Sequence, residues 1–181
     1  MKIPVAIQGV KGSYSEEAAH GFFGESAEII ECLNFEETFR SVISRQTKYA
    51  VVPLKNKIVG EITSATEFLI QTNLKISDEL PLEVRHVLCG TKTAEFENLI
   101  TVRSHIEALK QCRKFLSGNR HLRQVIGADT ASSIRRIVEE NLPENAAIGS
   151  RRAAEIYGAK ILQEDIADDP DNWTTFYVIG N

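Results

Sequence analysis

The sequence predicts an α/β fold with mainly parallel sheets flanked by helices. Strands and helices alternate along almost the whole chain, which favours parallel strands joined by helical crossovers. Residues 49–53 form a continuous apolar run, the pattern of a strand covered on both faces. Small polar residues follow several strands at the expected helix starts, where backbone N–H groups are available to anions. We therefore expect ligand sites at the carboxyl ends of the strands.

The apolar periodicity places each element in order. Strands are expected at residues 5–8, 29–32, 49–53, 99–102, 125–127, 146–149, 161–162 and 175–179. Helices are expected at residues 15–23, 35–45, 60–72, 104–116, 130–140 and 150–157. Residues 74–90 predict extended segments around one proline. Asn34, Asp129 and Ser150 are expected helix N-caps, and Gly158 ends the last helix.

Composition and charge narrow the class of protein. The chain has 181 residues, enough for one domain or two small lobes. Its net charge of −4 gives no general attraction to nucleic acid or to anionic membranes. No apolar run approaches the roughly 18 residues that a membrane span needs, and the N-terminus does not read as a signal peptide. These features predict a cytoplasmic protein that binds neither nucleic acid nor membrane.

Three cysteines, Cys32, Cys89 and Cys112, have no metal-ligand spacing. A small odd number of cysteines is typical of buried thiols in a reducing compartment. We therefore expect no metal site and no organic cofactor.

Two segments follow patterns known from an enzyme family. Residues 172–176 read NWTTF, which resembles the pattern NxTRF. Residues 52–60 read VPLKNKIVG, which resembles VPxENSxxG. Both patterns are those of the prephenate dehydratases, which this chain resembles. The frame is kept, but the family's Arg, Glu and Ser are replaced by Thr175, Lys55 and Lys57.

Four further segments resemble the same family in the same order. Residues 9–19 resemble GPxGTFSExAA, residues 104–112 are similar to SHPQALxQC, residues 129–131 resemble STA, and residues 146–158 resemble the AAIAS…YG segment. Six ordered matches over nearly the whole chain form a specific pattern.

The resemblance implies a two-lobed α/β fold similar to type II periplasmic binding proteins. The first lobe would hold residues 1–76 and 159–181, the second would hold residues 77–158, and the active site would lie in the cleft between them. Family members often carry a regulatory phenylalanine-binding domain after the catalytic part, and no such domain is expected in this chain. The substrate would be prephenate, and a homodimer or homotetramer is expected.

The resemblance also implies the site residues. Thr174, His105 and Asn56 would be catalytic. The expected substrate-binding residues are Ser13, Tyr14, Ser15, Lys55, Lys57, Thr130, Ala131, Thr175 and Phe176. In an extended segment, Lys55 and Lys57 point opposite to Asn56, so both a cleft-facing and a solvent-facing position stay open for the lysines.

The altered charged positions leave three functions open. They favour a prephenate decarboxylase of secondary metabolism, which keeps the ring hydroxyl and delivers a proton to ring carbon; His105 or His86 could supply it. The first alternative is a prephenate dehydratase forming phenylpyruvate, in which Thr174 acts on the ring hydroxyl. A free hydroxyl is a poor acid, so Thr174 would need oriented neighbours. The second alternative is a non-catalytic sensor that binds its ligand without turnover.

Overall fold

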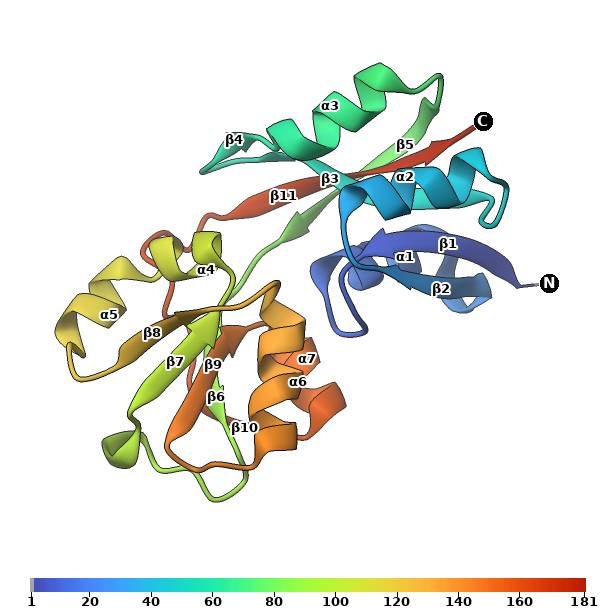
Figure 1. Cartoon of the computed structure of the whole chain (residues 1–181). Helices are drawn as coiled ribbons and strands as arrows, with labels where there is room; N and C mark the ends of the chain where they lie inside the picture. Colours follow the sequence, from blue (N-terminus) through green and yellow to red (C-terminus); the bar gives the residue numbers. More distant parts are fainter. Residues whose placement is uncertain (1) are drawn as a thin grey trace. The chain divides into compact units, whose positions relative to one another are not determined.

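The computed structural model describes residues 2–181, which form two compact units (Figure 1). The first unit comprises residues 2–10, Tyr14–Val84 and Asn172–Asn181, and the second comprises Lys11–Ser13 and Arg85–Asp171. Each unit is built around its own sheet. The contacts put the boundaries near residues 84 and 171, whereas the sequence placed them at 76 and 158.

The elements of the first unit confirm the strand and helix pattern expected for this part of the chain. They are β1 (Ile3–Gln8), α1 (Tyr14–Phe23), the 3-10 helix η1 (Gly24–Ser26), β2 (Ala27–Cys32), α2 (Phe35–Ile43), β3 (Tyr49–Asn56), β4 (Gly60–Glu61), α3 (Thr63–Gln71), β5 (Lys75–Glu83) and β11 (Trp173–Gly180). Asn34 caps α2, accepting a hydrogen bond from the backbone N–H of Glu37.

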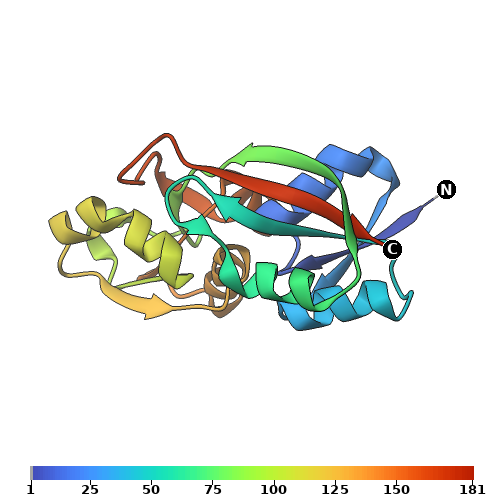
Figure 2. The same cartoon turned by 90° about the horizontal axis from the view of Figure 1, so that it is seen from above.

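The sheet of the first unit has the strand order β2-β1-β3-β11-β5, and β4 pairs with β3. β1 is parallel to both β2 and β3, whereas β11 is antiparallel to both β3 and β5. Figure 2 shows β11 running between these two neighbours, although it follows all other elements in the chain. The C-terminal strand β11 thus lies in the same sheet as strands from the N-terminal part of the chain.

Apolar side chains cover both faces of this sheet. On one face, Val5, Ile7, Val51 and Phe176 pack with α1. On the other, a second cluster packs with α2 and α3; it includes Ala6, Phe39, Val52, Leu54 and Ile179. Burial on both faces explains why residues 49–53 read as a continuous apolar run.

The second unit contains the remaining elements. They are β6 (Val87–Gly90), the 3-10 helix η2 (Phe96–Asn98), β7 (Thr101–Ser104), α4 (Ile106–Gln111), α5 (Arg113–Gly118), β8 (Arg123–Ile126), α6 (Thr130–Glu140), β9 (Asn145–Gly149), α7 (Arg151–Tyr157) and β10 (Lys160–Gln163). Its sheet has the order β10-β6-β9-β7-β8. Its main core lies between this sheet and α4 and α5, and includes Leu88, Val102, Leu109 and Ile148.

Both sheets are mixed, so the expectation of mainly parallel sheets holds only in part. The second sheet has parallel β7–β8 and β7–β9 pairs, but β6 is antiparallel to β9 and β10. The strands that run against the others in their sheet are β11 and the short β4 in one unit and β6 in the other, since β9 and β10 are both antiparallel to β6. In the chain β4 follows β3, β6 follows β5 and β11 follows β10 without a helix between them, so alternation of strands and helices did not reveal their direction.

Three expected helices differ from those observed. The helix expected at residues 104–116 is divided at Cys112 into α4 and α5. The helix expected to reach Arg45 ends at Ile43, and Arg45 has a left-handed φ of 60°. The helix expected at residues 60–72 begins only at Thr63, because Gly60 and Glu61 form β4. All three differences lie at helix ends or junctions, where local periodicity is least informative.

No helix within the described residues is long and apolar enough to cross a membrane.

Candidate active site

Asn56 and Thr174 face each other across the β3–β11 pair in the first unit. Asn56 is the last residue of β3, and Thr174 is its register partner near the start of β11. The Nδ2 of Asn56 donates to Thr174 Oγ1 over 2.8 Å and to Asn172 Oδ1 over 2.9 Å. All three side chains are buried. The pairing of two strands distant in sequence therefore creates a compact polar network.

The carbonyl end of the same Asn56 amide holds the turn that follows β3. Its Oδ1 accepts hydrogen bonds from the backbone N–H groups of Ile58 and Val59, both over 2.9 Å. Asparagine side chains stabilise such turns by imitating a backbone carbonyl. Because the oxygen is fixed by two backbone donors, the nitrogen must point toward Asn172 and Thr174.

This orientation decides the role of the Thr174 hydroxyl. An amide nitrogen only donates, so Thr174 Oγ1 is the acceptor in its bond with Asn56. The hydroxyl keeps its own proton, which can be donated to a further acceptor. The network therefore presents Thr174 as a hydrogen-bond donor.

Thr175 and Lys55 occupy the opposite face of the same two strands. They are register partners, and alternation along a strand directs them away from the face of Thr174 and Asn56. Lys55 and Lys57 are both exposed. The register shifts between Thr175 and Phe176, and Phe176 packs in the core beside α1.

The turn before α1 is closely packed in the second unit. Gly12 has a φ of +87°, and a Cβ there would lie 3.0 Å from the Cα of Ala153. Its carbonyl accepts a hydrogen bond from Ser150 Oγ over 3.1 Å, and the Lys11 carbonyl accepts one from the Tyr157 hydroxyl over 2.6 Å. This packing gives a physical reason for the glycine at position 12.

The expected site residues at the start of α1 lie just after this turn. Ser13 and Ser15 are buried, and Tyr14 is half-buried. Tyr14 packs against the first unit's core beside α1.

His105 is the N-cap of α4. It is half-exposed, and its Nδ1 accepts a hydrogen bond from the backbone N–H of Glu107 over 3.3 Å. With Nδ1 as the acceptor, the proton of the neutral ring is on Nε2. His105 therefore has a structural role that is separate from any proton transfer.

His86 lies in the interior of the second unit. Its Nε2 lies 2.8 Å from Gln111 Oε1. Burial lowers the pKa of His86, and the hydrogen bond with Gln111 opposes this effect only in part. His86 is therefore held in its neutral form.

Thr130 and Ala131 are the first residues of α6. Asp129 caps this helix, with Oδ1 accepting from the backbone N–H of Ser132 over 2.7 Å. Thr130 is half-buried, and Ala131 is fully buried. Burial of Ala131 is explained by packing within the second unit.

The expected site residues fall into two groups. The first unit holds Asn56, Thr174, Lys55, Lys57, Thr175, Phe176, Tyr14 and Ser15, and the second holds Ser13, His105, Thr130 and Ala131. Among these residues, a direct hydrogen bond joins Asn56 and Thr174.

Within residues 2–181, no group of three or more His, Cys, Asp or Glu side chains is placed to hold a metal ion.

Two residues of interest were missed by sequence reasoning. Asn172 is fully buried and completes the Asn56–Thr174 network, and Gln111 partners His86. Asn172 lies within one of the family-like segments, so its amide could have been identified from that pattern. Gln111 also lies within a family-like segment, at residues 104–112, but its pairing with His86 could not be predicted because the two residues are distant in sequence.

Comparison with known proteins connects this arrangement to a family. A sequence model of the family described as prephenate dehydratase matches residues 5–181. The arogenate dehydratase/prephenate dehydratase 2, chloroplastic, of Arabidopsis thaliana is 38% identical over 179 residues, which cover 99% of this chain and 46% of that protein. The bifunctional chorismate mutase/prephenate dehydratase of Escherichia coli strain K12 is 33% identical over 179 residues, covering 97% and 46%. The chain thus spans about half the length of these curated relatives.

Solved structures agree with this result. The prephenate dehydratase from Arthrobacter aurescens in complex with L-Phe superposes with a TM-score of 0.89 at 26% identity, covering 99% of this chain and 60% of that one. The ligand-binding component of an ABC-type import system from Staphylococcus aureus superposes with a TM-score of 0.52 at 14% identity, covering 99% and 66%. The second match shows only that the fold is shared with periplasmic-binding-protein-like proteins.

Proposed function

Because this chain belongs to the prephenate dehydratase family, we propose that it is a lyase that consumes prephenate and expels both carbon dioxide and the ring hydroxyl. The observation that supports dehydration is the Asn56–Thr174 hydrogen bond, which leaves the Thr174 proton available to the ring hydroxyl. Phenylpyruvate is then the product. The relatives named above are called arogenate or prephenate dehydratases, which favours the same reaction.

In this reaction the bond between the ring and its carboxylate breaks, and its electrons enter the ring. The carbon–oxygen bond to the ring hydroxyl breaks at the same time, and the ring becomes aromatic. Prephenate is a dianion and phenylpyruvate a monoanion, so the departing hydroxide takes up one proton and leaves as water. Thr174 would donate a hydrogen bond to that oxygen and regain its proton from solvent. Positioned donors of this kind stabilise charge as it develops on a leaving group.

Positions 55 and 175 differ from the family pattern, but these differences remove no side chain from the strand face that carries Asn56 and Thr174. Lys55 and Thr175 are register partners on the opposite face of the strands. The family pattern places Glu and Arg at these two positions, where they would form a cross-strand ion pair. Both changes therefore concern one lost pair on the face away from Thr174, which supports dehydration over decarboxylation.

The second candidate is a prephenate decarboxylase that keeps the ring hydroxyl. The observation that favours it is the replacement of three polar or charged family residues by Lys55, Lys57 and Thr175. In this reaction carbon dioxide leaves and a proton is added to ring carbon. His105 and His86 are the histidines considered for that step, but His86 is buried and its pKa is lowered.

Proton NMR of the products separates these functions. Prephenate incubated with the protein should give the aromatic signals of phenylpyruvate. Vinyl signals with a retained carbinol proton would instead establish decarboxylation. A rise in melting temperature with prephenate unchanged would establish a binding protein, the third function considered. A parallel incubation with arogenate would show which of the two substrates is preferred, because the Arabidopsis relative is named for both.

Restoring the family arginine gives a second test. If dehydration depends on Thr174, the Thr175→Arg variant should form phenylpyruvate at a rate close to that of the unmodified protein. If the unmodified protein forms none and Thr175→Arg creates the activity, the dehydratase proposal is wrong.

Further features of the proposal come from the family pattern. We place the substrate against Ser13, Tyr14, Ser15, Thr130, Ala131 and Phe176. The same pattern includes Lys55, Lys57 and Thr175, but we assign them no substrate contact, because Lys55 and Thr175 lie on the face opposite to Thr174 and Lys57 is exposed. A cytoplasmic location is supported by Cys32, Cys89 and Cys112, which are free and buried. A homodimer or homotetramer is proposed from the family alone, and size-exclusion chromatography with light scattering tests it.

A further inference from the structure

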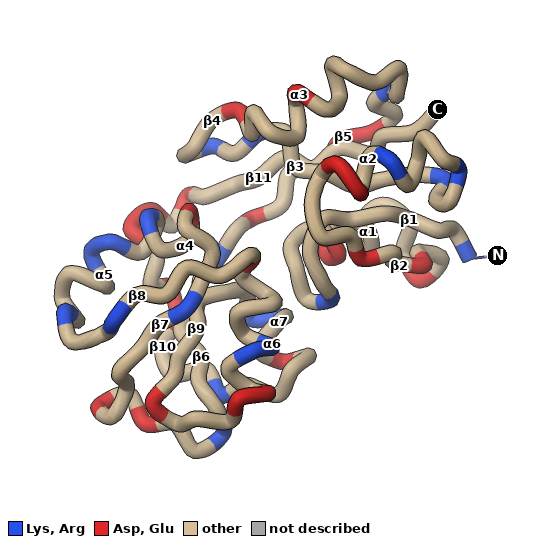
Figure 3. The backbone as a smooth tube through the Cα atoms, in the orientation of Figure 1, with Lys and Arg blue, Asp and Glu red and all other residues tan. Residues whose placement is uncertain are grey.

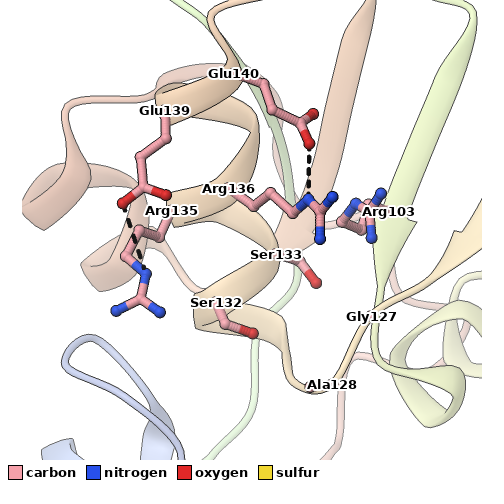
Figure 4. A pocket seen from close by; sticks show the side chains of 9 residues that line it. All are labelled: Arg103, Gly127, Ala128, Ser132, Ser133, Arg135, Arg136, Glu139 and Glu140. Atoms are coloured by element: carbon pink, nitrogen blue, oxygen red, sulfur yellow. Dashed lines mark hydrogen bonds and ion pairs between the residues drawn. The ribbon is translucent and has the colours of Figure 1, made fainter.

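A pocket of about 500 Å³ lies beside α6 in the second unit, against β7 and the loop that precedes the helix (Figure 4). Its lining combines three arginines and two glutamates with small residues, among them Arg103, Arg136, Glu140, Gly127, Ser132 and Ser133. Three arginines against two glutamates leave the lining with one net positive charge, whereas the whole chain carries −4. Figure 3 shows further Lys and Arg on β8 and α5 of this unit.

Arg103 occupies an unusual place for a cation. It lies on β7, an inner strand of the sheet, with Val125 and Ala147 as its register neighbours on either side. The side chain is half-buried, and within residues 2–181 its guanidinium forms no hydrogen bond or ion pair. A partly desolvated cation is costly unless an opposite charge or an acceptor compensates it.

Arg136 brings a second guanidinium to the same pocket. Its Nε donates to Glu140 Oε1 over 2.7 Å. The hydrogen bond from Arg136 lowers the pKa of Glu140 most strongly, and the charge of Arg103 lowers it further. Both arginines thus act on one carboxylate, which leaves one positive charge unbalanced there.

Gly127 keeps this space open. A Cβ at position 127 would lie 2.3 Å from Ser133 Oγ and 3.4 Å from Arg103 Cγ, so any larger residue would fill the pocket. Ser133 Oγ donates to the Asp129 carbonyl over 2.6 Å, and Ser132 Oγ donates to it over 3.3 Å. The serine protons are therefore used within α6, and the donors left for a ligand are guanidinium N–H groups.

We propose that Arg103 and Arg136 form a binding site for the oxyanion group of a small metabolite, a carboxylate or a phosphate ester. The planar guanidinium of Arg103 matches such a group with two parallel hydrogen bonds. Arg136 supplies the second cation, and the serine oxygens can accept from a hydroxyl or ammonium group of the ligand. The site is separate from the proposed turnover residues, none of which lines this pocket.

Titration with simple anions tests the site directly. Sodium phosphate and sodium acetate are added to the full chain, with sodium chloride at matched ionic strength as the reference, and binding is followed by calorimetry and by melting temperature. At least one of the two oxyanions should bind and raise the melting temperature above that in chloride. Arg103→Gln should weaken that binding about tenfold or more, since a charge-assisted pair is lost. Arg123→Gln is the matched control, because Arg123 is an exposed arginine on the neighbouring β8 and does not line the pocket.

The proposal is overturned if neither oxyanion acts differently from chloride, or if Arg103→Gln binds as tightly as the unmodified protein. Melting of Arg103→Gln without added anion shows that the variant is folded. The KM for prephenate should be unchanged in Arg103→Gln. A raised KM would show that the pocket serves the substrate and is not a separate site.

Discussion

The amide nitrogen of Asn56 donates a 2.8 Å hydrogen bond to the hydroxyl oxygen of Thr174, across two antiparallel strands. The direction of this bond determines the direction of the threonine proton. Two backbone N–H groups hold the amide oxygen, so the amide cannot reverse without breaking the turn after β3. A short hydrogen-bond chain thus links the backbone of a surface turn to the proposed catalytic hydroxyl.

Replacing Thr174 by valine should abolish turnover. Valine keeps the shape but has no proton to donate, so formation of phenylpyruvate from prephenate should fall by at least about 100-fold. Thr174→Ser keeps the hydroxyl and should retain most of the activity. If the valine variant works at a rate close to that of the serine variant, Thr174 has no part in the reaction.

Replacing Asn56 by aspartate tests the hydrogen bond to Thr174 without removing the bonds that hold the turn. Aspartate can still accept from Ile58 and Val59, but it has no N–H to donate to Thr174. The Thr174 hydroxyl then donates its proton to the carboxylate, and the turnover number should fall by about 100-fold. Steady-state kinetics measures this, and an unchanged turnover number would contradict the assigned bond direction.

Asn56→Ala is the companion variant, because it removes both ends of the amide. Asn172 and the backbone N–H groups of Ile58 and Val59 lose their hydrogen bonds with this amide, so the free energy of unfolding should fall by about 2–3 kcal/mol. Urea denaturation measures this loss. Asn56→Asp should be clearly more stable than Asn56→Ala; equal losses would show that the turn bonds contribute little.

The Lys55→Glu/Thr175→Arg double variant should restore a cross-strand ion pair without changing the product. Directly opposed charges on neighbouring strands contribute about 0.2–1 kcal/mol, so a double-mutant cycle should give a small positive coupling. The product should remain phenylpyruvate because both side chains lie on the face opposite to Thr174. A change of product would place these residues in the reaction itself.

Ser150→Ala should destabilise the second unit more than Asp129→Ala does. Ser150 Oγ accepts a hydrogen bond from the backbone N–H of Ala153 over 3.0 Å, which caps α7, and it also donates one to the Gly12 carbonyl. The Asp129 side chain makes only the capping bond of α6, to the backbone N–H of Ser132. The expected losses are about 1–2 kcal/mol for Ser150→Ala and about 1 kcal/mol for Asp129→Ala. Chemical denaturation compares them, and the reverse order would contradict a structural role for the Gly12 contact.

Burial of His86 should make the protein less stable in mild acid. Its pKa is lowered in the folded state, so below the ordinary value of 6.5 the unfolded chain binds more protons than the folded one. Stability from this residue is therefore complete above pH 6.5 and is lost as the pH falls from there toward the folded-state pKa. Unfolding free energies at pH 7.5 and 5.5 should differ less in His86→Gln than in the unmodified protein. An equal difference in both would exclude His86 as the cause.

The sequence was sufficient to predict most helices and strands. Alternating apolar segments located the strands, and side-chain caps located α2, α6 and α7 where the structure has them. The family-like segments around Asn56 and Thr174 turned out to be register partners. Local patterns therefore identified the two residues that the fold brings together.

The directions of β6 and β11 could not be predicted, because strand direction depends on pairing with distant segments. For the same reason the unit boundaries were displaced. Residues 77–84 join the first unit through pairing of β5 with β11, and residues 159–171 join the second, where β10 pairs with β6. The orientation of the Asn56 amide could not be predicted from the sequence either, because it is determined by contacts with Asn172 and with two backbone N–H groups.

The central position of β11 has a consequence during synthesis of the chain. While the ribosome is still adding residues before Trp173, β3 and β5 have no strand between them, and the backbone N–H and C=O groups along that edge of β3 are open to other nascent chains. The first unit can therefore close only after residues 173–180 have left the exit tunnel. Thr174 arrives with this last strand, so completion of the sheet and completion of the proposed catalytic network are one event.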